Sequence, residues 1–398
     1  MKKIYYGRAV YNNKEINAVL KVLKNDSLSL TDGRNVKLLE AKVAKLFGKK
    51  YGLMVNSGSS ANLLALASFK FKKGSEIITP NLTFSTTVAP IYQLGLIPHF
   101  IGVEPNKFVA DCNQIEKCIN KKTVAIMIPN LLGNIANWKK INQIAKKNKL
   151  KVIEDSADTI GYSINGSNTG IYSDIVTNSF YASHIINGAG TGGIVCFNDY
   201  DQYIKAKLLR GWGRSSATLN ESESINKRFN VRISGINYDA KYVFSEMGYN
   251  FLPSEISASF AIEQLKKLEN NIKIRNRNFS KLISFFKKYE SLFKLPESYQ
   301  GVRTPWLAFP LVIKKNNFFD RKKLQIYLEK NNIQTRTIFT GNILKQPVMK
   351  NRIYKKHKNC DIVANDVMKN GILIGCHHGM SINDVNLICK VFLKIIKK

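Results

Sequence analysis

The sequence predicts an α/β protein with a large domain on a mostly parallel sheet and a smaller C-terminal α/β domain. Three observations favour this class. Short apolar runs alternate with amphipathic segments from about residue 51 to residue 210, a pattern typical of a parallel sheet covered by helices on both faces. A second strand–helix series begins near residue 290. The length of 398 residues suits one large and one small domain. We expect the domains to span residues 1–255 and 256–398.

The order of elements follows from hydrophobic periodicity. Two amphipathic helices, at 13–24 and about 36–47, precede the first strand. In the large domain we expect strands at 51–55, 76–80, 98–103, 123–129, 151–154 and 194–197, and helices at 61–66, 84–94, 112–120, 137–148 and 199–210. One long helix at 253–286 leads into the small domain. There we expect strands at 307–313, 333–336 and 371–374, and helices at 320–330, 362–369 and around 388–395.

Residues 211–250 are polar and lack clear periodicity. A segment of this length without regular structure, in a compact domain, indicates either a functional loop or an interaction arm. Its four glycines, at 211, 213, 235 and 248, agree with an irregular path. The sequence alone does not choose between the two.

The formal charge of +33 is unusual and raises nucleic-acid or membrane binding as alternatives. The lysines are spread over almost every expected helix and form no basic arm. An anionic small-molecule substrate or a lysine-rich proteome explains the charge at least as well as such binding does. We therefore expect no nucleic-acid or membrane partner. No apolar run approaches the ~20 residues of a membrane helix, and the first residues lack the apolar core of a signal peptide.

The six cysteines form no Cys-x-x-Cys pair. Neither a zinc site nor a disulfide framework is indicated, and no metal is expected. We expect a cytoplasmic protein.

Several candidate residues fall at the expected carboxyl ends of strands, where open α/β sheets bind ligands. Ser59 and Ser60 lie where a strand, a small polar turn and a helix start follow one another, which makes an anion site, although a plain helix cap explains them equally well. The others are Phe84, Asn130, Asp155, Asp158 and His184.

The run from Ser179 to His184, followed by a glycine-rich stretch to Gly193, resembles the cofactor-anchoring segment of the DegT/DnrJ/EryC1/StrS family. Its sugar aminotransferases use pyridoxal 5'-phosphate (PLP). The resemblance extends from about Val10 to Phe392. It implies a PLP-dependent transferase of fold type I, like aspartate aminotransferase. Where that family carries the lysine that bonds to the cofactor, this chain has His184, and no lysine lies between residues 151 and 205. A small subgroup with this exchange removes a sugar hydroxyl instead of adding an amine.

The resemblance also implies roles for the other candidates. Asp155 would pair with the pyridine nitrogen of PLP and Asp158 would lie near its phenolic oxygen. Phe84 would stack on the ring, although an aromatic residue one turn into a helix is as often core. Ser179 would hold the phosphate. Asn250, in a Gly-Tyr-Asn motif, would reach the phosphate of a neighbouring subunit, so the protein would be a homodimer with shared active sites.

Two groups of histidine-bearing relatives share further motifs. Asn130 and Arg336 lie in segments that resemble GDP-4-keto-6-deoxymannose 3-dehydratases, and Arg336 would bind a donor carboxylate or a sugar diphosphate. The run from Trp212 to Arg214 resembles CDP-4-keto-6-deoxyglucose 3-dehydrases, which carry an iron–sulfur cluster. No cysteine lies between residues 196 and 360, and a [2Fe–2S] cluster needs four thiolates. We therefore expect no cluster of that type in this region, which argues against a reductase-coupled mechanism. Thr191 stands where many relatives have glutamate.

The function implied is C3 dehydration of a nucleotide-linked 4-keto-6-deoxyhexose, in the synthesis of a 3,6-dideoxysugar for a surface polysaccharide. PLP and its amine form, pyridoxamine phosphate (PMP), would be the cofactors and glutamate the amino donor. Histidine moves protons near neutral pH, so His184 would be the general base. The nucleotide stays open between GDP and CDP. Alternatives are a reductase-coupled dehydrase and a catalytically silent PLP-fold binding protein. The retained Asp155, Ser179 and Asn250 argue against the silent protein.

Overall fold

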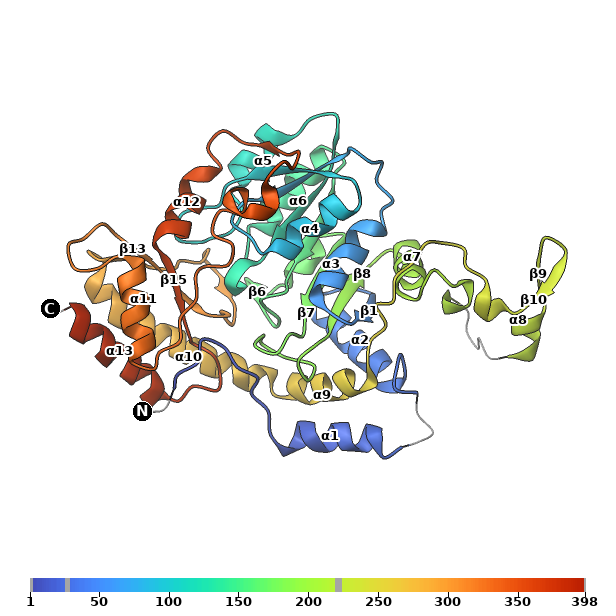
Figure 1. Ribbon diagram of the computed structural model, residues 1–398, viewed down its shortest axis with the longest axis horizontal. Helices are drawn as coiled ribbons and strands as arrows, with labels where there is room; N and C mark the ends of the chain where they lie inside the picture. The colour runs from blue at the N-terminus through green and yellow to red at the C-terminus, as the bar shows by residue number, and fades with distance from the viewer. Residues whose placement is uncertain (1–2, 26–28, 219–223, 397–398) are drawn as a thin grey trace.

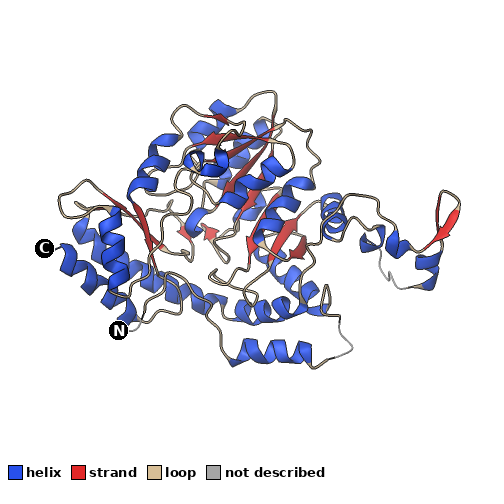
Figure 2. Ribbon diagram, viewed as in Figure 1, coloured by secondary structure: helices blue, strands red, loops and turns tan. Residues whose placement is uncertain are grey.

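The computed structural model describes residues 3–25, 29–218 and 224–396. Its centre is an eight-stranded sheet in the order β1-β8-β7-β5-β4-β2-β3-β14, covered by helices (Figure 1, Figure 2). β8 runs antiparallel to both β1 and β7, and the other neighbours are parallel. The strands are β1 (Tyr51–Val55), β2 (Glu76–Pro80), β3 (Ile97–Ile101), β4 (Thr123–Pro129), β5 (Lys151–Asp155), β7 (Ile175–Ser179), β8 (Gly193–Phe197) and β14 (Lys355–Lys356). The predicted α/β class and mostly parallel sheet are confirmed.

Each face of this sheet has its own apolar core, because successive side chains of a strand point to opposite faces. In β4, Ile126 and Ile128 enter one buried cluster, whereas Ala125 and Met127 enter another. The helices around the sheet are α1 (Asn13–Leu23), α2 (Arg34–Leu46), α3 (Gly58–Ala67), α4 (Ser85–Gln93), α5 (Cys112–Cys118), α6 (Trp138–Lys147) and α7 (Tyr200–Arg210). Burial on both faces explains why these strands read as continuous apolar runs.

The small domain packs helices against a three-stranded antiparallel sheet in the order β11-β13-β15. Its core is aromatic: Phe286 lies edge-on to Phe392, with 4.8 Å between ring centroids, and also contacts Phe293 and Phe309. The elements are β11 (Phe293–Lys294), β13 (Phe309–Ile313), β15 (Gly371–Ile374), α11 (Arg321–Lys330), α12 (Asp361–Asn370) and α13 (Ile382–Ile396).

The expected single helix at 253–286 is wrong, because two helices occupy this stretch. α9 (Glu255–Lys266) ends at Lys267, and α10 (Leu268–Phe286) begins after it. The Lys267 amide donates to the carbonyls of Gln264 and Leu265, which tightens the last turn of α9. The break also brings Lys267 Nζ to within 2.6 Å of Glu15 Oε2 in α1. α9 therefore stays with α1 and α2, while α10 enters the small domain (Figure 1).

The expected strand at 333–336 is also wrong. Only isolated bridges form there, between Ile4 and Ile333 and between Arg336 and Leu373. The two ends of this stretch pair with different partners, so no continuous ladder develops. Segments also cross between the regions, because Ile4 belongs to the core of the small domain and β14 extends the large sheet at β3. The domain boundary near residue 255 stays a prediction.

Much of the polar segment 211–250 forms an arm that projects from the body of the molecule (Figure 1). Its described part contains the short helix α8 (Ile225–Phe229) and a hairpin of β9 (Val231–Ile233) and β10 (Ile236–Tyr238). Large apolar side chains are exposed along it: Ile225, Phe229, Ile233, Ile236, Tyr238, Tyr242, Phe244 and Met247. Of the two alternatives, a functional loop and an interaction arm, this arrangement favours the interaction arm.

Candidate active site

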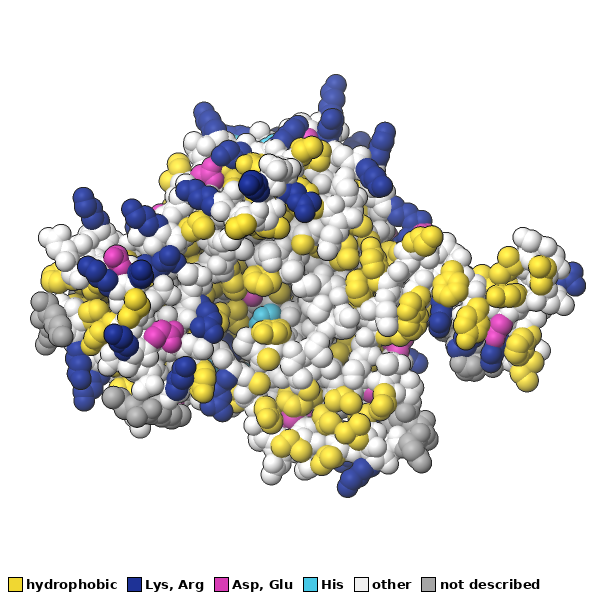
Figure 3. All heavy atoms as spheres, in the orientation of Figure 1, with side chains coloured by type: hydrophobic (Ala, Val, Ile, Leu, Met, Phe, Trp, Pro, Cys, Tyr) yellow, Lys and Arg dark blue, Asp and Glu magenta, His cyan; other side chains and the backbone are white. Residues whose placement is uncertain are grey.

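A cavity of about 860 Å³ opens where carboxyl ends of the central parallel strands meet loops of the small domain. Figure 3 shows a hollow near the middle of this face with a histidine side chain visible inside it. Its position agrees with the rule that open α/β sheets bind ligands beyond their strands. Seven of the predicted residues line it: Ser59, Phe84, Asp155, Asp158, Ser179, His184 and Arg336.

Asp155, the last residue of β5, presents a buried carboxylate to the cavity and is only 4% exposed. Oδ2 accepts hydrogen bonds of 2.8 Å from Asn62 Nδ2 and from Thr87 Oγ1, and Oδ1 accepts one of 3.1 Å from the Ala157 amide. Burial raises the pKa of Asp155, and these hydrogen bonds offset part of that rise. Among the described residues no lysine or arginine forms an ion pair with it. Such a carboxylate suits a cationic ligand group.

Asp158 lies on the turn after β5 and points to the same cavity. Its Oδ2 accepts a 2.8 Å hydrogen bond from the Leu132 amide. Burial, and then the nearby charge of Asp155, raise the pKa of Asp158 to about 7. Leu132 has a φ of 62°, which is unusual for a leucine, so the backbone that offers this amide is held by its surroundings. Burial thus raises the pKa of both carboxyl groups.

His184 follows β7 and lies within the cavity wall. Its Nδ1 is 3.3 Å from the Ser179 carbonyl oxygen. A carbonyl can only accept, so Nδ1 carries the proton and Nε2 keeps its lone pair. Burial lowers the pKa of His184 to about 4, and the charge of Arg275 also lowers it. The Tyr181 ring lies edge-on to the imidazole, with 5.7 Å between centroids. Its Nε2 has no hydrogen-bond partner among the described residues, so the site holds a neutral imidazole whose second nitrogen can accept a proton.

Phe84 precedes α4 and is 49% exposed. The alternative that it belongs to the core is wrong. Its ring contacts Phe339 of the small domain edge-on, at 5.8 Å between centroids. A large aromatic side chain open to a cavity offers a face on which a planar ring can stack.

The N-terminus of α3 faces the cavity beside Ser179. Ser57 caps the helix and accepts a 3.1 Å hydrogen bond from the Ser60 amide, and Ser59 is exposed to the cavity. A Cβ added at Gly58 would lie 2.5 Å from Ser179 Cβ, so only glycine fits there. A helix start with nearby hydroxyl groups is a good phosphate site.

Two predicted residues lie behind the cavity wall. Ser60 is buried and donates to Asn56 Oδ1 at 2.7 Å. Asn130 is fully buried, and its amide is saturated. The Nδ2 group donates to Glu154 and Ser156, and Oδ1 accepts from Ala136 and Trp138. No atom of Asn130 remains for a ligand, so its predicted contact with substrate is wrong. The Asn130 side chain instead orders the turn after β4.

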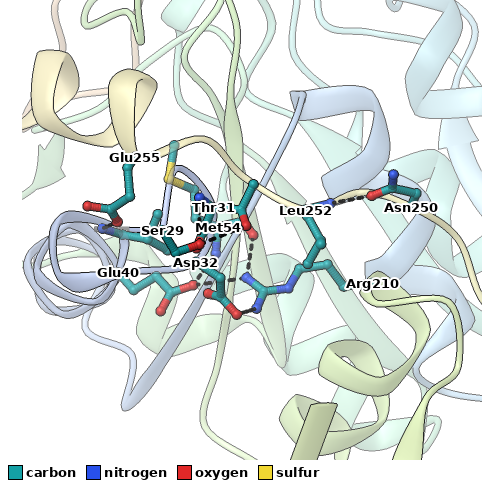
Figure 4. Close-up of polar contacts among 10 residues, drawn as sticks. Ser29, Thr31, Asp32, Glu40, Met54, Arg210, Asn250, Leu252 and Glu255 are labelled. Carbon is teal, nitrogen blue, oxygen red and sulfur yellow. Dashed lines mark hydrogen bonds and ion pairs between the residues drawn. The ribbon is translucent and has the colours of Figure 1, made fainter. Parts of the chain in front are cut away.

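Asn250 is exposed and outside the lining of this cavity. It pairs with Gly211 at the base of the arm. Figure 4 shows its side-chain oxygen turned to the Leu252 amide, near Arg210. Arg210 is itself held by Asp32 Oδ2 at 2.6 Å. The Asn250 backbone thus pairs with the chain at the base of the arm, and its side chain lies outside the lining of the cavity.

Arg336 lines the cavity from the small domain and is exposed. Its Nη1 donates to the Thr335 carbonyl at 2.8 Å, and no described carboxylate pairs with it. The guanidinium thus has donors left for an anion. Thr191 also lines the cavity and donates to the Asn56 carbonyl at 2.5 Å.

Sequence reasoning missed Asn62 and Thr87, which hold Asp155, and also Tyr6, which lines the cavity. Asn62 left a signal, because it is a polar residue within the apolar run of α3. Its Oδ1 accepts a 2.6 Å hydrogen bond from Thr177 Oγ1 in β7. Tyr6 left none, since it lies far from the other site residues in sequence.

The residues present fit PLP. The buried Asp155 carboxylate suits the pyridinium nitrogen, the open Phe84 ring suits the pyridine face, and the start of α3 beside Ser179 suits the phosphate. All three lie on one cavity. The fold and this cavity define a PLP-dependent protein of the aminotransferase type.

Comparisons with known proteins identify the family. Residues 10–393 match the DegT/DnrJ/EryC1/StrS aminotransferase family, and the chain belongs to it. It is 34% identical over 379 residues to the GDP-4-keto-6-deoxy-D-mannose 3-dehydratase of Escherichia coli O55:H7, covering 93% of this chain and 94% of that one. It is also 34% identical over 367 residues to the dTDP-4-dehydro-2,6-dideoxy-D-glucose 3-dehydratase of Saccharopolyspora spinosa, covering 87% and 78%.

Solved structures agree. The E. coli GDP-4-keto-6-deoxy-D-mannose 3-dehydratase with bound hydrated PLP superimposes with a TM-score of 0.88 at 32% identity, over 98% of this chain and 99% of that one. A GDP-4-keto-6-deoxymannose 3-dehydratase with a trapped PLP–glutamate adduct gives 0.87 at 30% identity, with the same coverage. The predicted family and fold type are confirmed.

Two findings concern other kinds of site. Within the described ranges, no three or more His, Cys, Asp or Glu side chains gather in a way that would hold a metal ion. A search of the same ranges for a helix with the length and apolarity of a membrane span found none.

Proposed function

We propose that the chain catalyses the PLP- and PMP-dependent removal of the C3 hydroxyl from a nucleotide-linked 4-keto-6-deoxyhexose, with glutamate as amino donor. One observation carries the proposal. At the motif position where aminotransferases of the family have lysine, the cavity holds His184 with a neutral ring and a free Nε2. The similar proteins named 3-dehydratases, from E. coli and S. spinosa, support the same reaction class.

The chain's own side chains supply the proton chemistry. When bound, PLP or PMP supplies an electron sink that delocalises negative charge formed beside its ring. Asp155, buried and without a cation, would keep the pyridine nitrogen protonated and so maintain that sink. His184 would take up a proton at Nε2, while the Ser179 carbonyl fixes the orientation of its ring. The same imidazolium would then protonate the departing hydroxyl.

Retention of the cofactor would depend on non-covalent contacts alone, because an imidazole has no primary amine. Phe84 would stack on the ring and the start of α3, with Ser59 and Ser179, would hold the phosphate. Arg336 would receive an anionic group of either substrate. The GDP-linked ligand of one similar 3-dehydratase structure supports a nucleotide sugar as the second substrate.

We also propose that two copies assemble and share their sites. The support is the projecting arm, whose exposed apolar side chains include Ile225, Ile236 and Met247 at 74%, 66% and 96%. Such a surface is typical of interfaces. Asn250 lies at its base and outside its own cavity, so it would contact the cofactor phosphate of the second copy. Light scattering should give twice the mass of one chain. Mixing inactive Asn250→Ala and His184→Ala variants should restore part of the activity, because mixed dimers contain one intact site.

We place the protein in the cytoplasm, where nucleotide sugars are made and thiols stay reduced. All six cysteines are free, and five of them are buried.

The test is an assay on purified protein with PLP, glutamate and a series of GDP-, CDP- and dTDP-linked 4-keto-6-deoxy sugars, without an added reductase. We expect a 3-deoxy product, with 2-oxoglutarate and ammonia released together. 2-Oxoglutarate with an amino sugar and no ammonia would contradict the role of His184. Turnover only after a reductase is added would favour the reductase-coupled alternative. Loss of all PLP or PMP on dialysis, with no turnover, would favour a binding protein.

His184→Lys is the sharpest variant for this assay. The amine should bond to PLP, and 3-deoxy product should fall by more than about 100-fold, because a general base contributes that much. Retained dehydration in this variant would contradict the assignment.

A further inference from the structure

The first described residues form a strap, residues 3–7, that begins in the small domain. The Gln334 amide donates to the Ile4 carbonyl at 2.8 Å, and the Tyr6 amide donates to Gln334 Oε1 at 3.0 Å. In Figure 1 this dark blue segment runs from the small domain towards α1. The strap is therefore fixed by backbone contacts on one side of the cavity.

The other end of the strap touches the loop that carries the general base. A Cβ added at Gly7 would lie 3.0 Å from Ser183 Cβ, and Ser183 precedes His184. The strap therefore joins the small domain to the catalytic loop. Tyr6, between these two anchors, has a fixed backbone position.

Tyr6 faces the same cavity as His184, Asp158 and Arg336. The side chain is partly buried, and its hydroxyl makes no hydrogen bond with any residue in the described ranges. The Arg336 guanidinium lies 5.9 Å from the centroid of its ring. Burial, and then the charge of Asp158, raise the pKa of Tyr6 above its usual range. The phenol therefore stays a donor throughout the physiological pH range.

We propose that Tyr6 is a further substrate-contacting residue, whose hydroxyl acts with the Arg336 guanidinium to bind the carboxylate of the amino donor. The inference rests on the proposed function, in which glutamate loads the cofactor. A hydroxyl that faces the cavity without a protein partner is available to donate to a ligand. A carboxylate accepts up to four hydrogen bonds, so it can take the fork of Arg336 and the single donor of Tyr6 together.

The surroundings favour a carboxylate over the sugar diphosphate at this position. Asp158 lines the same wall and carries partial negative charge near neutral pH. Coulomb repulsion scales with charge, so a diphosphate with two negative charges meets about twice the repulsion that a carboxylate meets. The diphosphate is therefore expected at a part of the site farther from Asp158.

The experiment isolates the donor half of the reaction. PLP-loaded wild-type and Tyr6→Phe proteins are mixed with glutamate and no sugar, and the loss of PLP absorbance is followed in a single turnover. The dependence of the rate on glutamate concentration gives a Kd and a limiting rate. We expect the Kd of Tyr6→Phe to rise about ten-fold, the loss typical of one hydrogen bond to a charged group. Tyr5→Phe, an exposed neighbour outside the cavity lining, should keep the wild-type Kd.

The steady-state KM for the nucleotide sugar separates binding from a structural role. In Tyr6→Phe it should stay within about two-fold of wild type, because only one hydroxyl is lost and the ring remains. An unchanged glutamate Kd, or a rise in the KM of the nucleotide sugar alone, would overturn the inference and leave the proposed function intact. A wild-type protein that does not react with glutamate would contradict the proposed function itself, and this inference with it.

Discussion

Asp155→Asn tests whether the buried carboxylate holds the cofactor. The substitution keeps the shape of the side chain and replaces one oxygen with an NH2 group. Asp155 accepts three hydrogen bonds, two at Oδ2 and one at Oδ1. Either orientation of the amide turns its NH2 towards a donor, from Asn62 on one side or from the Ala157 amide on the other. The variant therefore creates one donor–donor conflict and removes a negative charge.

The two effects have different magnitudes and different dependences on the cofactor. The conflict costs about 1–3 kcal/mol of folding free energy with or without PLP. The lost charge removes a charge-assisted hydrogen bond to the pyridinium, worth about 1.5–3 kcal/mol. Since 1.4 kcal/mol is a factor of ten, the Kd for PLP should rise about 10- to 150-fold. Turnover should fall further, because an unprotonated ring is a poor electron sink.

Equilibrium dialysis measures the Kd, and urea unfolding of the apo and PLP-loaded proteins separates the two effects. Asp199→Asn is the matched control, since Asp199 caps α7 outside the cavity and asparagine caps helices equally well. Asp155→Asn with a wild-type Kd and wild-type turnover would refute the assignment. Equal destabilisation of the apo and loaded proteins would show that Asp155 acts only in folding.

Three further predictions concern other parts of the molecule. Gly58→Ala should raise the Kd for PLP about ten-fold, because the new Cβ would lie 2.5 Å from Ser179 Cβ and must displace a phosphate contact. An unchanged Kd in equilibrium dialysis would contradict the assignment of the cofactor phosphate to the start of α3. Between pH 8 and about 5, kcat/KM should show no loss attributable to His184, because the pKa of His184 is lowered to about 4 and the neutral imidazole persists over this range. A fall in kcat/KM near pH 6.5 that moves with substitution of His184 would contradict this. Glu15→Gln should lower the free energy of unfolding by about 2 kcal/mol, the scale of one hydrogen bond to a charged group, because buried Glu15 pairs with Lys267 at 2.6 Å. Burial favours a higher pKa for Glu15, but hydrogen bonds such as that from Lys267 lower the pKa overall. The stabilisation should therefore be present above the unfolded-state pKa and be lost as pH falls through the folded-state pKa. Urea titrations at several pH values would check this.

Most strands of the large domain were predictable because a strand buried on both faces of the sheet has a continuous apolar sequence. β4 was located from its apolar run, over the same residues that the structure gives. β7 was not assigned in advance, since its sequence Ile175–Ser179 contains three polar residues. Those residues are buried by partners far away in sequence, as when Asn178 donates to the Thr159 carbonyl at 2.9 Å. Periodicity alone does not reveal such tertiary hydrogen bonds.

The break at Lys267 was hidden for a related reason. The residues around it have good helix propensity and continue an apolar face, so local rules favour one helix. The buried carboxylate of Glu15, about 250 positions earlier, fixes Lys267. This long-range contact accompanies the break, and it becomes visible only after α1 and α9 are packed together.

The site was predictable where a residue follows a strand, and less so where its side-chain direction matters. Asp155 and His184 line the cavity as the strand ends indicated. Asn130 follows β4 in the same way, yet its amide turns inward to Glu154 and Trp138. Strand order gives the edge on which a residue lies, whereas hydrogen-bond demand in the core decides which way it points.

The pocket around His184 also bears on why one residue type decides the chemistry. This pocket acts on His184 mainly by burying it, and burial disfavours a positive charge at this position. A lysine placed there would lose its proton for the same reason, and an unprotonated amine is the form that attacks a carbonyl carbon. The surroundings would therefore serve a covalent anchor as well as they serve a free base. We infer that the environment permits both chemistries, and that the absence of a primary amine at residue 184 selects proton transfer.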